Sequence, residues 1–273
     1  MKVELKTWAA LGLATALAGA GLAGCSGEAG ENGEGADAAQ VGEGGEGGEG
    51  GEGGESGEGG VEIADAAKDP ITYNAALAIA EAHVLAGRDA YRMGKTDAAA
   101  EMFVHPVSEV LADMDPVFAE LGVDDFKSLF SQASQAALAG ESSEEVDAKV
   151  DAIIEALRAA SLKAPDNGTT AGAIAGGVVA DQIERAVAMY AEAASNDQYA
   201  PYLDGYGFYM AAKAQFELSE SAIRSENENL HTRIGQALAL LAKAYATAER
   251  PATLDANQGA LSGASSSVML AAG

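Results

Sequence analysis

A tract rich in glycine and glutamate limits where this chain can form a core. Residues 26–60 contain nine glutamates and one aspartate but no lysine or arginine, and the stretch 42–60 reads GEGGEGGEGGEGGESGEGG. Such a tract has too few apolar side chains to bury and repels itself, so we expect a disordered, extended tether. Glycine at every third position is also seen in collagen, but the absence of proline argues against a triple helix. A spacer is the role we favour over a weak cation-binding segment or an export signal.

The segment before the tether has the composition of a secretory signal peptide. Lys2 and Lys6 precede an uncharged stretch, 7–23, made largely of alanine, leucine and glycine. This order of a basic region and an apolar region is typical of a signal peptide, and about 17 residues is at or below the length that spans a bilayer. We therefore expect residues 1–24 to be a cleaved signal rather than a transmembrane helix.

The only cysteine of the chain lies at the end of this segment. The sequence Leu22-Ala23-Gly24-Cys25 resembles the lipobox of bacterial lipoproteins. The resemblance implies that Cys25 is acylated and becomes the first residue of the mature chain, followed by the tether over 25–60. Two or more acyl chains attach a protein stably to a bilayer. Ser26 after the cysteine favours, by the same resemblance, the outer membrane with the protein facing the periplasm.

The charge of the chain excludes some functions. With 42 acidic and 16 basic residues the formal net charge is −26, which repels phosphate backbones and anionic head groups. Nucleic-acid binding and attachment through a basic patch are therefore not expected. A lone cysteine forms neither an internal disulfide nor a multi-cysteine metal site.

The remaining residues read as helix almost throughout. Helix-start signals, such as Asp69-Pro70 and the capping box of Ser142 with Glu145, alternate with stops at glycine and proline, and no stretch shows sustained two-residue alternation. We predict an all-α domain over 61–250, a bundle of about seven helices arranged up-and-down or as packed hairpins, and a low-complexity tail over 251–273. The expected helices are about 70–94, 96–122, 124–140, one that follows the Ser142 capping box and includes Leu157, one that begins at Thr170 and includes Tyr190, 201–224 and 226–249.

Three histidines are candidates for a metal site. His105-Pro106 falls inside the second predicted helix, where proline should break or kink it, and Glu109 follows His105 by four residues. This group is either a metal or haem-type ligand set at a kink or, the interpretation we favour, a histidine that caps the restarted helix. Glu228 and His231 have the Glu-x-x-His spacing of bundle-core metal sites, but a di-iron site needs two such motifs and this chain has one.

A group of tyrosines at the start of the sixth predicted helix is the other candidate binding surface. Tyr202, Tyr206 and Tyr209 share one helical face, and Tyr199 precedes them. They form either a surface that stacks on a ligand or partner or, more commonly for such a stripe, part of the core with phenol oxygens at the edge.

No catalytic motif is present. The chain has no Gly-x-Ser-x-Gly, no phosphate-binding loop and no His-Glu-x-x-His, and its only cysteine is assigned to acylation. We therefore expect a non-enzymatic protein without a catalytic residue or an organic cofactor.

Three weaker resemblances concern the folded part. The stretch 78–120, which includes His83, His105, Pro106 and Glu109, resembles uncharacterised exported helical proteins, and the whole is loosely similar to imelysin-like, iron-regulated lipoproteins. The second resemblance implies metal binding through His83, His105, Glu109 and His231, although the His-x-x-Glu motif of that family is here His-x-x-x-Glu. The same stretch also resembles a single tetratricopeptide unit, where three stacked repeats are the usual minimum.

Three functions follow from these observations. The leading hypothesis is a lipid-anchored helical module that binds an envelope protein or small ligand, with the tyrosines and the His105 region facing it. The alternatives are metal binding or uptake in the imelysin manner, and a tetratricopeptide-like interaction scaffold.

Overall fold

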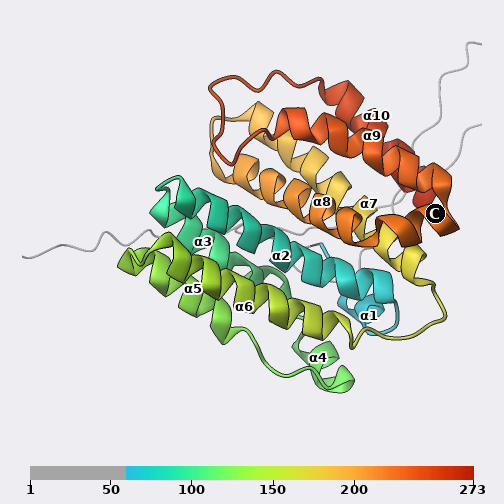
Figure 1. Cartoon of the computed structure of the whole chain (residues 1–273), viewed down its shortest axis with the longest axis horizontal. Helices are drawn as coiled ribbons and strands as arrows, with labels where there is room; N and C mark the ends of the chain where they lie inside the picture. Colours follow the sequence, from blue (N-terminus) through green and yellow to red (C-terminus); the bar gives the residue numbers. More distant parts are fainter. Residues whose placement is uncertain (1–59) are drawn as a thin grey trace, which may run out of the picture. The chain divides into compact units, whose positions relative to one another are not determined.

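The computed structural model describes residues 60–273, and within this range the protein contains ten α-helices, one π-helix and no strand (Figure 1). This confirms the predicted all-α bundle. The signal peptide, Cys25 and most of the tether predicted above lie outside the described residues. No helix within the described range is long and apolar enough to cross a bilayer. The helices are α1 (Ile63–Ala66), α2 (Pro70–Arg92), α3 (Thr96–Pro106), the π-helix η1 (Val107–Leu111), α4 (Asp115–Leu121), α5 (Ser128–Ala139), α6 (Ser143–Ser161), α7 (Ala171–Ser195), α8 (Ala200–Glu226), α9 (Glu228–Ala244) and α10 (Gln258–Ala272).

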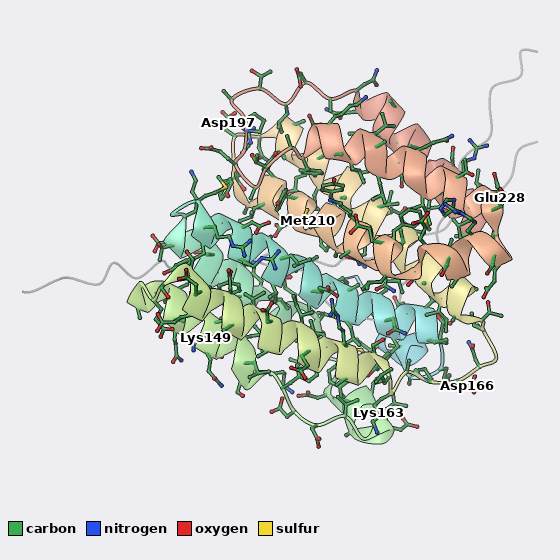
Figure 2. The ribbon with its side chains drawn as sticks, viewed as in Figure 1. Lys149, Lys163, Asp166, Asp197, Met210 and Glu228 are labelled. Carbon is green, nitrogen blue, oxygen red and sulfur yellow. The ribbon has the colours of Figure 1, made fainter. Side chains whose placement is uncertain are left out.

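Helix α2 is the centre of the bundle. It contacts α3 and α6 on one side and α7 and α8 on the other, and buries 15 of its 23 residues (Figure 1). A helix that is apolar nearly all round belongs in the interior of a domain. Helix α5 packs on α3 and α6, and α9 and α10 pack on α7. Charged side chains such as Lys163, Asp197 and Glu228 lie on the outside (Figure 2).

The helix starts follow the signals in the sequence. The side chain of Asp69 accepts a hydrogen bond from the backbone N–H of Thr72 at 2.9 Å, with Pro70 in the first turn of α2. Ser142 and Glu145 form the predicted capping box at the start of α6. Each cap satisfies donors that a helix start leaves without an intrahelical partner.

The predicted break at His105-Pro106 is present and is a change of helix type. Pro106 ends α3 and is followed directly by η1, in which the backbone N–H of Ala112 donates to the carbonyl of Val107 at 3.0 Å. Proline has no N–H to continue the α-helical ladder, and π-turns inside helices are frequent at functional sites. The expected second helix is thus divided into α3, η1 and α4.

The C-terminal segment differs from the prediction. Composition indicated a low-complexity tail over 251–273, but residues 258–272 form α10, capped by Asn257 and packed on α7 and α9. Leu261 and Val268 are buried there, seven residues apart on one face. These two residues face the bundle, whereas Met269 and Leu270 of the same helix are exposed.

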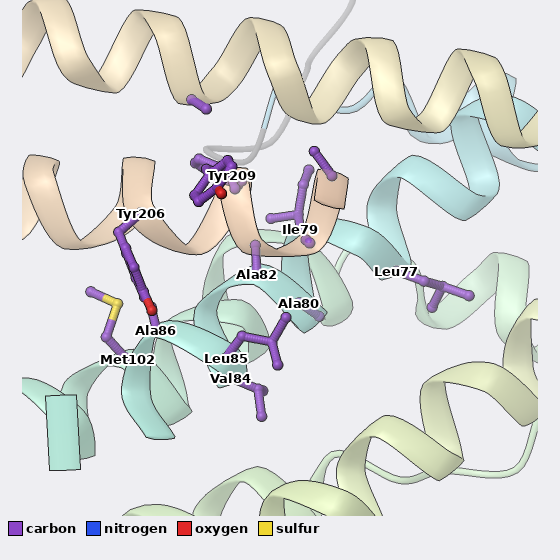
Figure 3. Packing of buried hydrophobic residues seen from close by; sticks show 14 of the residues in the cluster. Leu77, Ile79, Ala80, Ala82, Val84, Leu85, Ala86, Met102, Tyr206 and Tyr209 are labelled. Atoms are coloured by element: carbon purple, nitrogen blue, oxygen red, sulfur yellow. The ribbon is translucent and has the colours of Figure 1, made fainter. Parts of the chain in front are cut away.

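The tyrosines at the start of α8 belong to the core, which is the interpretation favoured from the sequence, and not to an open ligand surface formed by Tyr199, Tyr202, Tyr206 and Tyr209. Tyr202, Tyr206 and Tyr209 are buried, and Figure 3 shows Tyr206 reaching from α8 towards Ala86 and Met102. The hydroxyls of Tyr199 and Tyr202 each donate at 2.9 Å to carbonyls of Ala248 and Thr247. Burial raises the pKa of both phenols to about 12, so they are uncharged anchors for the loop after α9.

Candidate metal centre

A close approach of α8 to α2 positions the centre of the site. A Cβ atom at Gly207 would lie 2.4 Å from the carbonyl oxygen of Ala82, so only glycine lets the two helices meet here. Ala82 precedes His83, and Asp204 is three residues before Gly207, on the same face of α8. The glycine therefore places the carboxylate of Asp204 against the imidazole of His83.

A second close approach brings in α3. A Cβ atom at Gly87 would lie 2.7 Å from the ring of Phe103, and Gly87 is one helical turn after His83. Phe103 is two residues before His105 and is fully buried. Packing of α3 on α2 at this point brings the end of α3 and the start of η1, with His105 and Glu109, next to His83.

His83 is the most buried member of the group, with 5% of its side chain exposed. Its Nδ1 lies 2.8 Å from the carbonyl oxygen of Ile79, which only accepts, so Nδ1 carries a proton and donates. Its Nε2 faces two carboxylates, at 3.2 Å from Oε2 of Glu109 and 3.7 Å from Oδ1 of Asp204. A neutral imidazole would direct its lone pair at both anions, so the geometry calls for a cation at this point, either a proton on Nε2 or a metal ion.

Asp204 distinguishes between these two cations. Its Oδ1 is buried and has no hydrogen-bond partner among the described residues. A proton on Nε2 of His83 would be donated to Glu109, the closer carboxylate, and would leave Oδ1 of Asp204 unpaired at 3.7 Å. A buried polar atom without a partner costs stability, and such an atom is a sign of an absent ion or water. A metal ion would satisfy both carboxylates and the imidazole together.

His105 and Glu109 complete the group. Nδ1 of His105 lies 3.6 Å from Oε1 of Glu109, and the rings of His83 and His105 are 6.2 Å apart between centroids. Glu109 thus contacts one histidine with each of its carboxylate oxygens. Donor atoms of His83, His105 and Asp204 all lie within 4.8 Å of one another. Ligands of one metal ion at 2.0–2.2 Å are separated by roughly 3 to 4.4 Å, so a side-chain movement of under about 1 Å brings them together.

The electrostatics of the group follow from its burial and its charges. Burial lowers the pKa of His83, but the hydrogen bond to Glu109 and the charges of Asp204 and Glu109 outweigh it, so the pKa is raised. The hydrogen bond to His83 lowers the pKa of Glu109. Burial raises the pKa of Asp204, against the attraction of His83. The site therefore favours positive charge at its centre.

The ligand types restrict the metal. Two imidazoles and two carboxylates suit a divalent transition metal such as zinc, iron or manganese, whereas calcium and magnesium prefer oxygen alone and copper(I) prefers sulfur. The hydrogen bond from Nδ1 of His83 to Ile79 is the kind of outer contact that fixes the tautomer of a ligating histidine.

A cavity of about 290 Å³ opens beside these ligands. His83, Glu109 and Asp204 form part of its wall, and residues of α2, α7 and α8 supply the rest. The other lining residues are Ile79, Arg185, Ala188, Met189 and Phe208. Three of the candidate ligands therefore lie at the edge of a cavity.

The structure separates the residues that the sequence grouped as metal ligands. His83, His105 and Glu109 come together, whereas His231 lies on α9, where its Nε2 is 3.2 Å from Glu220 and its ring is 5.2 Å from that of Phe216. Asp204 was not predicted. The sequence feature that could have pointed to Asp204 is the pair of glycines after it, Gly205 and Gly207. They indicate that other helices approach the backbone of α8 closely on two sides.

No protein family, curated protein or solved structure matches this chain significantly. The site is therefore interpreted from its own geometry.

Proposed function

We propose that this chain is a lipid-anchored, all-helical protein of the bacterial envelope that binds one divalent transition-metal ion between α2, the α3–η1 junction and α8. The ligands are His83, His105, Glu109 and Asp204. The observation that carries the proposal is the pair of carboxylates around Nε2 of His83, one of which has a buried oxygen without a hydrogen-bond partner. Metal binding is the alternative to the binding-module hypothesis drawn from the sequence, and it is the one that the geometry of these residues supports best.

The ligands come from helices far apart in the sequence, which makes the site part of the fold. His83 is on the central helix α2, Glu109 on η1 and Asp204 on α8. A metal ion would connect both sides of the bundle through α2, and its binding free energy would add to the stability of the folded state. With two histidines and two carboxylates, Zn²⁺ is expected to bind more tightly than Mn²⁺.

The proposal is tested by titrating Zn²⁺ into the metal-free full chain by calorimetry. We expect one equivalent to bind, and the variant His83→Gln to bind at least about 100-fold more weakly because it loses a ligand whose outer contacts alone are worth 10- to 100-fold. His231→Gln is the matched control, the same substitution outside the site, and should leave the affinity unchanged. Equal losses in both variants, or no stoichiometric Zn²⁺ in the wild type, would exclude the site.

The envelope location rests on the lipobox resemblance of Leu22 to Cys25 and has a separate test. Growth of an expressing bacterium with an alkyne fatty acid should label the wild-type chain and leave Cys25→Ser unlabelled. A labelled Cys25→Ser variant, or an unlabelled wild type, would remove the anchor and leave the metal site unaffected.

A further inference from the structure

A groove of about 810 Å³ lies between α8 and α9. Asn227 alone joins the two helices, and they run antiparallel, because Glu220 lies next to His231 and Tyr209 next to Tyr245. The volume is within the range of small-molecule pockets. None of the four proposed metal ligands lines this groove, so it is a separate candidate site.

The groove is open because α9 contributes small residues where α8 contributes large ones. Gly235, Ala239 and Ala242 are spaced by four and three residues and share one face of α9. A Cβ atom at Gly235 would meet no atom within 4 Å, so the space above it is open. On α8 the groove is lined by Tyr209 and Phe216, two turns and thus roughly 10 Å apart along the helix axis. This length accommodates a molecule of two fused rings.

The hydroxyl of Tyr209 is a polar group without a protein partner at the wall of this groove. The chain has eight tyrosines, and the hydroxyls of the other seven all form hydrogen bonds within the protein. Tyr209 is only 7% exposed, yet its hydroxyl has no hydrogen-bond partner among the described residues. Its ring stacks on that of Tyr245 in the core, with centroids 6.4 Å apart, which fixes the phenol in place. An unpaired hydroxyl in so buried a residue is rare, and a ligand would supply its partner.

This hydroxyl is available as a hydrogen-bond donor. Burial raises the pKa of the Tyr209 phenol, so the group keeps its proton at neutral pH. A phenol that carries its proton donates to an acceptor such as a carbonyl oxygen. The polar recognition element of the groove is therefore a neutral donor.

The charged side chains along the groove are paired with one another. Nζ of Lys213 lies 3.9 Å from Oε1 of Glu217. Oε1 of Glu220 lies 2.5 Å from Nη2 of Arg224 and 3.2 Å from Nε2 of His231. The groove thus has no charge that requires a charged ligand, and the net charge of −26 repels anions. An uncharged ligand is favoured.

An aromatic surface lies at the other end of the groove. The rings of Phe216 and His231 are 5.2 Å apart between centroids and tilted by 35°. Aromatic rings attract further rings in offset or edge-to-face arrangements. Opposite them, Gly235 and Ala239 let a flat molecule lie close to the backbone of α9.

We propose that the groove between α8 and α9 binds an uncharged, planar molecule of at least two fused rings that carries a carbonyl group. The carbonyl oxygen accepts a hydrogen bond from the hydroxyl of Tyr209, and the rings pack between Phe216 and the small residues of α9. This site does not depend on the proposed metal centre.

Coumarin is a suitable probe, because it is uncharged and planar and carries a carbonyl group on two fused rings. Equilibrium dialysis of the full chain should show one coumarin bound per chain. Coumarin-3-carboxylate, which adds a negative charge to the same rings, should bind more weakly. Naphthalene has two fused rings without an acceptor and serves as the reference ligand for the variants below.

The variant Tyr209→Phe tests the hydroxyl. It should bind coumarin about 3- to 10-fold more weakly, the effect of losing one neutral hydrogen bond, and should bind naphthalene as the wild type does. Because the hydroxyl has no protein partner, the melting temperature should stay unchanged. Tyr202→Phe is the matched control. It loses the hydrogen bond to Thr247, so it should melt lower and bind coumarin with unchanged affinity.

The variant Gly235→Leu tests the groove itself. It should bind both coumarin and naphthalene at least about ten-fold more weakly, because the leucine and the ligand would overlap. The space at Gly235 is open and leucine favours a helix more than glycine does, so the variant should be at least as stable as the wild type. Gly263→Leu is the matched control, since Gly263 is an exposed glycine of α10 with the same open space, and should leave binding unchanged.

Four outcomes would overturn the proposal. Coumarin that does not bind saturably, or binds equally to the wild type and Gly235→Leu, would exclude the site. Coumarin affinity that is unchanged in Tyr209→Phe would exclude the hydrogen bond, and coumarin-3-carboxylate binding as tightly as coumarin would exclude the preference for an uncharged ligand. A wild-type dimer in sedimentation velocity that Gly235→Leu dissociates would show that a second copy of the chain occupies the groove.

Discussion

Two histidines of this protein, His83 and His231, each face a carboxylate, and their surroundings differ in one respect. At His231, Glu220 pairs with Arg224, and Nη2 of Arg224 lies 3.0 Å from Nε2 of the imidazole. At His83, two carboxylates face Nε2, and among the described residues neither forms an ion pair with a lysine or arginine. The carboxylate of the first cluster is paired with an arginine, whereas the carboxylates of the second are paired, among the described residues, with histidines alone.

Burial increases the consequence of this difference. Glu220 is 47% exposed and water screens its charge, whereas Asp204 is 21% exposed and His83 only 5%. Interactions between charges are stronger in the interior, and a buried charge without a partner is costly. A histidine beside a carboxylate therefore indicates a metal site only under two conditions. No arginine is paired with the carboxylate, and the carboxylate is buried enough that water does not screen its charge.

The largest expected effect is stabilisation by metal at the His83 cluster alone. Zn²⁺ at 100 times its dissociation constant should stabilise the wild type by about 2.7 kcal/mol. For a domain of this size, this raises the melting temperature by roughly 5 to 10 °C. Thermal unfolding followed by circular dichroism should show the shift in the wild type and in Glu220→Gln, but not in Asp204→Asn. A shift that survives Asp204→Asn would mean that Zn²⁺ is bound elsewhere.

The second effect concerns the metal-free protein. Asp204→Asn should stabilise it by about 1 kcal/mol, because it replaces a buried carboxylate whose Oδ1 has no hydrogen-bond partner among the described residues by a neutral group. Glu220→Gln should destabilise it by about 0.5 kcal/mol or less, as expected for an exposed ion pair. Urea unfolding at neutral pH measures both changes.

The pH dependence of the first change follows from the direction of the pKa shift. Burial raises the pKa of Asp204, so its carboxylate costs stability as the pH rises through that pKa and costs none below the ordinary value of 3.8, where the group is neutral in both states. The gain from Asp204→Asn should therefore disappear at low pH. A gain that grows as the pH falls would contradict the assignment of the cost to this charge.

The smallest expected effect is on Zn²⁺ binding at the His231 cluster, after a substitution that makes this cluster more like the one at His83. Arg224→Gln removes the cation from His231 and Glu220 and should create a second, weak Zn²⁺ event that the wild type lacks. With only two ligands, it should be at least about 100-fold weaker than the first event. Calorimetry resolves the two affinities, and a variant with a single unchanged event would show that the arginine is not what distinguishes the clusters.

Much of the fold was predictable from local signals. Asp69-Pro70, the Ser142 capping box and the break at Pro106 each act within one helical turn, and the structure contains all three. The structure of residues 251–273 was harder to predict. Helix α10 depends on the burial of Leu261 and Val268 against α7 and α9, and composition alone does not reveal this packing.

The site was predictable only in part, for a related reason. His105 and Glu109 are neighbours along the chain, and their contact follows from helical spacing despite the π-turn. Asp204 is one of 42 acidic residues and lies beside His83 only because Gly207 lets α8 contact α2 at that point. His231 has a suitable local motif, but its neighbour Glu220 is already paired with Arg224, which lies seven residues before His231.

The most direct test of the account is the position of the metal. Crystals of the full chain grown with Zn²⁺ and measured at the zinc absorption edge should show an anomalous peak at about 2.0–2.2 Å from Nε2 of His83 and from Oδ1 of Asp204, with His105 and Glu109 completing the coordination. A map with no peak there, or with its strongest peak at His231 and Glu220, would contradict the assignment of the His83 cluster as the metal centre.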